Sequence, residues 1–109
     1  MQAGPFQKVL HLMTLINLVL KDLLPDTASR EKGKELRNII MDNLKNYSTI
    51  EIDFSGVVMT PSFADEAFGM LSLHMTVKEL KEKINFLSLT PAHKALLTHV
   101  IANRFTSPS

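Results

Sequence analysis

Ser62 has the most favourable local setting for chemistry in this sequence. It lies in the stretch IEIDFSGVVMTPSFADEAFGML, from Ile50 to Leu71, and Asp65 and Glu66 follow it within about one helical turn. A serine at the start of a helix can act as a nucleophile, accept a phosphate, or only cap the helix. Each role makes different demands on the residues around it.

A serine hydrolase would need a histidine base next to Ser62. His74 is twelve residues further along the predicted helix. At 1.5 Å per residue that is about 18 Å, whereas a nucleophile and its base must lie about 3 Å apart. His99 could approach only through the tertiary fold, and the G-x-S-x-G turn is absent because Ser62 stands in TPSFA. We therefore expect no catalytic residue and no enzymatic activity, with a small serine hydrolase as the remote alternative.

The acids and histidines lack a metal-binding pattern. Asp65 and Glu66 are adjacent, so their side chains diverge by about 100° around a helix and cannot easily share one ion. The histidines show no HExxH spacing, and we expect most of them to be exposed or half-buried. The helix dipole explains acids in a first turn, and Ser62 with Asp65 resembles a capping box. We expect no metal and no cofactor.

Composition indicates one small domain over residues 1–109, with residues 1–12 and 105–109 as loose termini. The net charge is +1 and the charges are dispersed, which argues against nucleic-acid binding. The chain has no cysteine, which fits a reducing compartment, and we expect a cytoplasmic location. The apolar run Val9–Leu20 is shorter than the roughly 20 residues that a membrane span needs, so we expect no membrane segment.

The first half of the chain predicts a strand and then a helix. Residues Met13–Leu20 are nearly all apolar, which fits a strand or a helix, and their length favours a buried strand. Thr27 or Ser29 can cap the following helix. Its apolar face carries Leu36, Ile39, Ile40 and Leu44. Gly33 lies on the same stripe, which indicates either close packing or a later helix start.

The second half repeats this alternation. STIEIDF and INFLSL predict strands, each followed by a helix that opens with Thr-Pro, at Thr60 and at Thr90. The first of these helices is expected to continue through Leu73, and the charged VKELKEK after it to form a solvated face. Alternating strands and helices predict an α/β fold with a mostly parallel sheet. Both Thr-Pro sites should lie at the carboxyl edge of that sheet, where ligands and partners bind.

Asp53 ends the first of these two strands and has two interpretations. Its carboxylate can hold the following turn by accepting backbone hydrogen bonds, which is common for Asp in turns. Alternatively it belongs to a binding surface.

The central stretch IEIDFSGVVMTPSFADEAFG resembles the signature of the STAS domain (sulfate transporter and anti-sigma factor antagonist). It is closer still to a STAS-like family of unknown function with an Asp-Phe-x-Gly-Val segment and a Ser-Phe-x-Asp-Glu helix start. The flanks ASREKGKELRNII and INFLSLTPAHKALLTHVIANR are similar to that family too. The resemblance extends roughly from Thr14 to Arg104. It implies a STAS-like fold and a role in protein–protein signalling.

STAS antagonists of bacterial partner-switching systems bind a histidine-kinase-like ATPase, and phosphorylation of a serine at the helix start controls that binding. The resemblance places this phosphorylation site at Ser62. The implied partner-binding residues are Asp53, Ser55, Gly56, Thr60, Ser62, Phe63, Asp65 and Glu66. Arg30 is a further candidate contact, because a guanidinium recognises carboxylate or phosphate, although it could equally be a solvated helix residue. The alternative function is a homodimer or scaffold module without a phosphoswitch.

Overall fold

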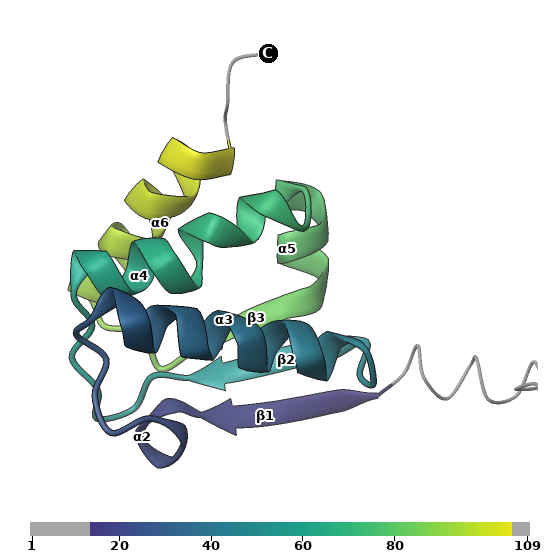
Figure 1. Ribbon diagram of the computed structural model, residues 1–109, viewed down its shortest axis with the longest axis horizontal. Coiled ribbons are helices and arrows are strands. Elements are labelled where there is room, and N and C mark those ends of the chain that lie inside the picture. The colour runs from purple at the N-terminus through teal and green to yellow at the C-terminus, as the bar shows by residue number, and fades with distance from the viewer. Residues whose placement is uncertain (1–13, 106–109) are drawn as a thin grey trace, which may run out of the picture.

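Strands and helices alternate along the chain (Figure 1). The computed structural model describes residues 14–105. The elements are β1 (Leu15–Val19), α2 (Leu20–Leu23), α3 (Arg30–Leu44), β2 (Thr49–Asp53), α4 (Pro61–Ala67), the 3-10 helix η1 (Gly69–Leu73), α5 (Val77–Lys83), β3 (Ile84–Leu87) and α6 (Pro91–Phe105). The predicted α/β class and parallel sheet are confirmed.

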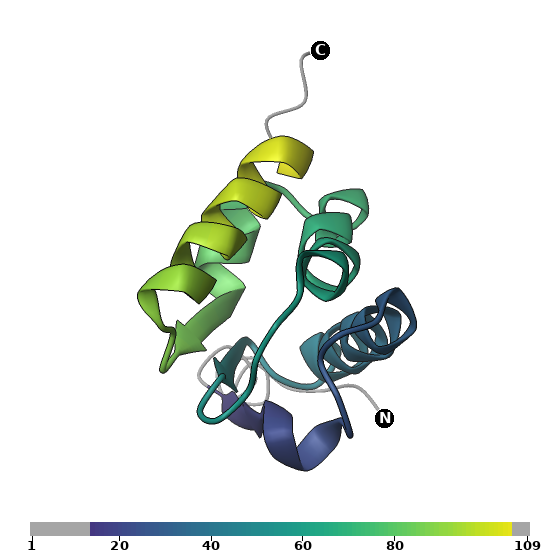
Figure 2. The ribbon, with the colours of Figure 1, turned by 90° about the vertical axis from the view of Figure 1, so that its left-hand side faces the viewer.

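The three strands form one parallel sheet in the order β1-β2-β3. Ile52 of the central strand pairs with Leu18 on one side and Phe86 on the other, and its side chain is fully buried. Parallel neighbours need crossovers that are almost always right-handed. Helices α3 and α4 accordingly lie on the same face of the sheet, and α6 continues their row beyond α4 (Figure 2).

Within the run Met13–Leu20, Leu15–Val19 forms the strand β1 and Leu20 begins α2; β1 is an edge strand rather than a buried one. The side chain of Leu18 points into the core, whereas Leu15 is 49% exposed. Met13 and the expected loose termini lie outside the described residues, apart from Phe105, which ends α6.

Helix α3 begins at Arg30, directly after its cap. The hydroxyl of Ser29 accepts a hydrogen bond from the Lys32 amide. Gly33 therefore lies within the helix, and close packing explains it: a Cβ there would come within 2.7 Å of the Phe63 carbonyl oxygen on α4. The later helix start is wrong, and the glycine lets α3 and α4 approach closely.

The long helix predicted from Pro61 through Leu73 is wrong, because the chain leaves the α conformation after Ala67 and continues as η1. Gly69 lies at this change. A Cβ at Gly69 would come within 2.8 Å of the Asp65 carboxylate and within 2.9 Å of a methyl group of Val100 on α6, so the glycine allows close packing there. Glycine is also a poor helix former. The segment VKELKEK forms its own helix, α5, with a capping box between Thr76 and Glu79.

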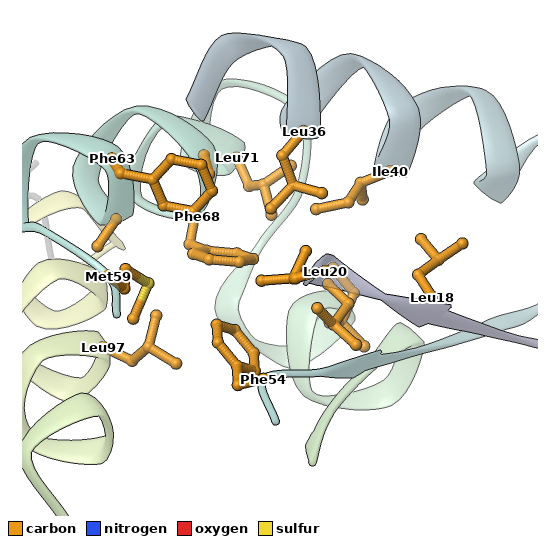
Figure 3. Close-up of a cluster of buried hydrophobic side chains, with 14 of the residues drawn as sticks. Leu18, Leu20, Leu36, Ile40, Phe54, Met59, Phe63, Phe68, Leu71 and Leu97 are labelled. Carbon is orange, nitrogen blue, oxygen red and sulfur yellow. The ribbon is translucent and has the colours of Figure 1, made fainter. Parts of the chain in front are cut away.

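The core lies between the sheet and the helices and centres on phenylalanines (Figure 3). Phe54 follows β2, and Phe63 and Phe68 come from the α4 segment. The rings of Phe54 and Phe68 are 5.8 Å apart between centroids, and those of Phe63 and Phe68 are 6.5 Å apart in an edge-on arrangement, as aromatic pairs prefer. This core fixes the end of β2 and the start of α4 relative to each other.

Candidate functional site

The turn after β2 is built around Asp53. Its Oδ1 atom accepts hydrogen bonds from the amide of Ser55 at 2.9 Å and from the hydroxyl of Ser55 at 2.6 Å. These bonds hold the pKa of Asp53 below its usual value. Gly56 follows with a φ of 73°, which favours glycine. Asp53 therefore stabilises the turn after β2, as expected for an aspartate that accepts hydrogen bonds in a turn. It holds Ser55 in place.

The segment between this turn and α4 is tied to two other parts of the fold. The Met59 amide donates to Nε2 of His93 on α6 at 3.1 Å. The Thr60 amide donates to the Thr27 carbonyl at 3.2 Å, and the Thr27 hydroxyl donates to the Val58 carbonyl. The backbone around Val58 is thus fixed on both sides.

The side chain of Val58 is nevertheless 80% exposed. Beside it lies a hollow of about 420 Å³ between the loop before α3 and the loop after β2, lined among others by Lys21, Asp26 and Gly56. Leu23 of α2 is another exposed large apolar side chain of this part of the fold. Because the backbone that carries Val58 is fixed, a contact made through this side chain would cost little additional conformational entropy.

The cap of α4 is Thr60. Its hydroxyl accepts a hydrogen bond from the Phe63 amide at 3.2 Å and donates to the Ala28 carbonyl. Pro61 occupies the first turn, as predicted. Ser62 therefore lies inside the helix, and the capping box between Ser62 and Asp65 is wrong. Its side chain is exposed and makes no hydrogen bond within residues 14–105.

Asp65 is held by two arginines from neighbouring helices. Arg104 of α6 donates two hydrogen bonds to its carboxylate, at 2.8 and 2.7 Å, and Arg30 of α3 donates one at 3.1 Å. Mainly because of Arg104, the pKa of Asp65 falls to about 2. Asp65 therefore links α4 to both flanking helices.

Glu66 makes a similar link to α3. Arg37 donates to its carboxylate at 2.7 Å and also to its backbone carbonyl, while Arg30 contributes a weaker contact at 3.4 Å. These bonds, chiefly the one from Arg37, lower the pKa of Glu66. Arg30 is thus paired with both acids instead of being only a solvated residue.

The structure brings most of the predicted site residues together. Ser55, Gly56, Thr60 and Ser62 all lie at or beyond the end of β2, and together with Val58 we call this surface the carboxyl edge. Phe63 is the exception among the predicted contacts: its side chain is fully buried, because it faces the core from the first turn of α4, so it cannot contact a partner.

Sequence reasoning missed four residues that support the site: Thr27, Arg37, His93 and Arg104. His93 is 8% exposed, whereas His74 and His99 are exposed, as was expected of most of the histidines. Its place three residues after Thr90, in the first turn of a Thr-Pro helix start, was the only feature of the sequence that pointed to a structural role for His93. Nothing in the sequence pointed to Arg37 or Arg104, since an arginine on a helix is usually solvated.

The described residues offer no histidine hydrogen-bonded to Ser62. The 18 Å separation from His74 assumed an unbroken helix, so it no longer holds as an argument. Within residues 14–105, no three His, Asp or Glu side chains converge as a metal ion would need. None of the helices in that range is long and apolar enough to cross a bilayer.

A family model described as a STAS-like domain of unknown function (DUF4325) matches residues 32–94. This chain belongs to that STAS-like family. The matched part of the STAS-like domain runs from the first turn of α3 to the first turn of α6 and includes the carboxyl edge. No curated protein and no solved structure matched the chain.

Proposed function

We propose that this STAS-like domain is a non-enzymatic regulatory module that binds another protein through the carboxyl edge and is controlled by phosphorylation of Ser62. The observation that carries the proposal is the setting of Ser62. Its hydroxyl is exposed and is not used by the fold, while the backbone around the neighbouring Val58 is fixed. A free hydroxyl next to a rigid apolar contact suits a modification that controls binding.

The arginines around α4 favour a phosphate at this position. Asp65 and Glu66 are three and four residues after Ser62, so each of them neighbours Ser62 on the helix surface. Two negative neighbours would repel a phosphate, but Arg30, Arg37 and Arg104 already compensate for their charge. The side chain of Arg30 is 56% exposed and its bonds are the longest of the set, so it has the freedom to turn toward a phosphoserine.

The partner class follows from the STAS resemblance: a histidine-kinase-like ATPase on a separate chain that phosphorylates Ser62. A phosphate adds about −1.5 to −2 charge, and near Val58 it would oppose burial of the carboxyl edge. Phosphorylation should therefore weaken the contact with this ATPase.

The test uses a purified histidine-kinase-like ATPase from the same source as the chain. We expect it to transfer phosphate to wild type and not to Ser62→Ala, and to bind Ser62→Asp at least about tenfold more weakly than Ser62→Ala, as charges near an interface can cause. Mass spectrometry locates the phosphate and titration calorimetry gives the affinities. Equal binding of all three proteins, with no phosphate on Ser62, would rule the proposal out.

A homodimer is the second candidate function, and the edge strand β1 favours it. Leu15 is half exposed on this strand, and in residues 14–105 only β2 pairs with it. Sedimentation at several protein concentrations tests this candidate. A stable dimer that also protects Val58 from solvent would favour it over partner switching.

A further inference from the structure

A second surface runs along the outer edge of β3, away from the carboxyl edge. Among the described residues β3 pairs only with β2, so no strand covers its other side. Two adjoining hollows of about 400 and 410 Å³ share Val77, Lys81, Phe86, Leu89 and Ile101, and so form one groove, the β3 groove. An edge strand beside an apolar groove can pair with an additional strand.

Helices α5 and α6 form the walls of the β3 groove. Val77 comes from α5, Ile101 comes from α6, and Phe86 of β3 lies between them. Helix α6 follows β3 as α4 follows β2, and it continues the row of helices past β3 (Figure 2). A helix that follows a strand in a right-handed crossover covers the next strand position. In residues 14–105 that position beneath α6 holds no strand.

The charges of the β3 groove indicate what it binds. Its charged lining residues are Lys81 and Lys94, both exposed, and no described acid lines it. Two lysines beside an apolar surface complement a ligand with apolar side chains and flanking carboxylates. A second copy of this chain would bring lysines against lysines. Residues 1–13 contain Lys8 and no acid, so they lack the complementary charge as well.

We propose that the β3 groove binds an extended segment of another protein, which adds to β3 as a fourth strand. Alternate apolar side chains of that segment enter the groove beside Phe86 and Ile101, and its acidic residues pair with Lys81 and Lys94. This interaction is independent of Ser62 and of the carboxyl edge.

The test is a screen of heptapeptides with apolar residues at the second, fourth and sixth positions. Half of the peptides carry glutamate at both ends and half carry lysine. We expect the glutamate peptides to bind, with NMR shifts centred on the amides of Asn85–Leu87 and on the groove side of α6. The lysine peptides should bind at least about tenfold more weakly, because like charges oppose them.

Charge reversal supplies the matched variants. Lys81→Glu with Lys94→Glu should weaken the best glutamate peptide about tenfold or more and strengthen its lysine counterpart. Lys34→Glu on α3 with Lys45→Glu just after its end changes the net charge equally, away from the groove. This double variant should bind the best glutamate peptide within about twofold of wild type. Circular dichroism confirms that both variants fold.

Three results would overturn the proposal: no peptide of either set binds, the two charge reversals have equal effects, or the shifts fall on Val58 and Ser62 instead. Protection of the β3 groove in a homodimer, or by residues 1–13 in the full chain, would also overturn it. A homodimer is detected by sedimentation, and protection by residues 1–13 is detected by comparing the full chain with one that lacks those residues. None of these results bears on Ser62 phosphorylation, so the two proposals can fail separately.

Discussion

His93 connects α6 to the loop that carries Val58. Its Nε2 atom accepts the Met59 amide, while Nδ1 is buried and has no partner among the described residues. Replacing His93 with Leu leaves the Met59 amide buried without an acceptor, which costs about 1–3 kcal/mol. We expect that loss in the free energy of unfolding measured in urea.

The matched control for this change is His99→Leu on the same helix, where the side chain is exposed and, within residues 14–105, hydrogen-bonds to Asn103 alone. It should change stability by less than about 0.5 kcal/mol. Equal losses for both variants would show that the bond from Met59 contributes nothing specific.

Gly33 sets the distance between α3 and α4. In Gly33→Ala the new methyl group would meet backbone atoms of α4 that cannot move aside alone, the nearest at 2.7 Å. We expect a loss of about 1–3 kcal/mol, although alanine is the better helix former. Lys34→Ala, one residue along and exposed, should be nearly neutral; a stabilised Gly33→Ala would contradict the close approach.

At the scale of the element, the start of α4 separates two roles that the sequence leaves ambiguous. Thr60 caps the helix and also bonds the segment before α3, whereas Ser62 does neither. Thr60→Ala should therefore cost about 1–2 kcal/mol and Ser62→Ala less than about 0.5 kcal/mol. Thermal unfolding of the two variants measures the difference. A larger loss of stability for Ser62→Ala would show that Ser62, and not Thr60, caps the helix.

The arginine pairs of Asp65 make the packing of α4 against α3 and α6 sensitive to acid. Asp65 has a pKa of about 2 in the fold and an ordinary value of 3.8. A lowered pKa stabilises the fold above the unfolded value, so this contribution is complete above about pH 4 and disappears as the pH falls toward 2.

Asp65→Asn should therefore lose about 1–2 kcal/mol at pH 7, less than the full shift because the arginines are partly exposed. The difference in the free energy of unfolding between this variant and wild type should shrink as the pH falls from 4 to 2. Urea unfolding across that range measures this, with Asp42→Asn, from an exposed pair with Lys45, as the control. A difference that does not change with pH would show that Asp65 acts without its charge.

At the scale of the whole molecule, patterns among neighbouring residues predicted the features that depend on neighbouring residues. The alternation in STIEIDF and the Thr-Pro helix starts predicted β2, α4 and α6, and Asp53 was expected to hold its turn. Contacts between distant segments could not be predicted. Gly69 approaches α6 closely, His93 accepts a hydrogen bond from the Met59 amide, and Asp65 pairs with Arg104, thirty-nine residues away. A single sequence carries no signal for such pairs.

The same distinction applies to the candidate site. Ser55, Gly56, Thr60 and Ser62 lie in one continuous stretch, so their proximity followed from the sequence. Val58 did not stand out, because its exposure results from anchors on Thr27 and His93. Phe63 was misplaced because a helix position near a surface can still point inward.

The central claim is that the carboxyl edge is a protein contact, and Val58 tests it most directly. Val58 and Leu73 are both highly exposed, at 80% and 70%, but only Val58 lies at this edge, so aspartate at either position should leave the fold intact. The measurement is the affinity of Val58→Asp and Leu73→Asp for the histidine-kinase-like ATPase. We predict that Val58→Asp weakens binding about tenfold or more and that Leu73→Asp binds like wild type. Equal affinities for the two variants would contradict the claim.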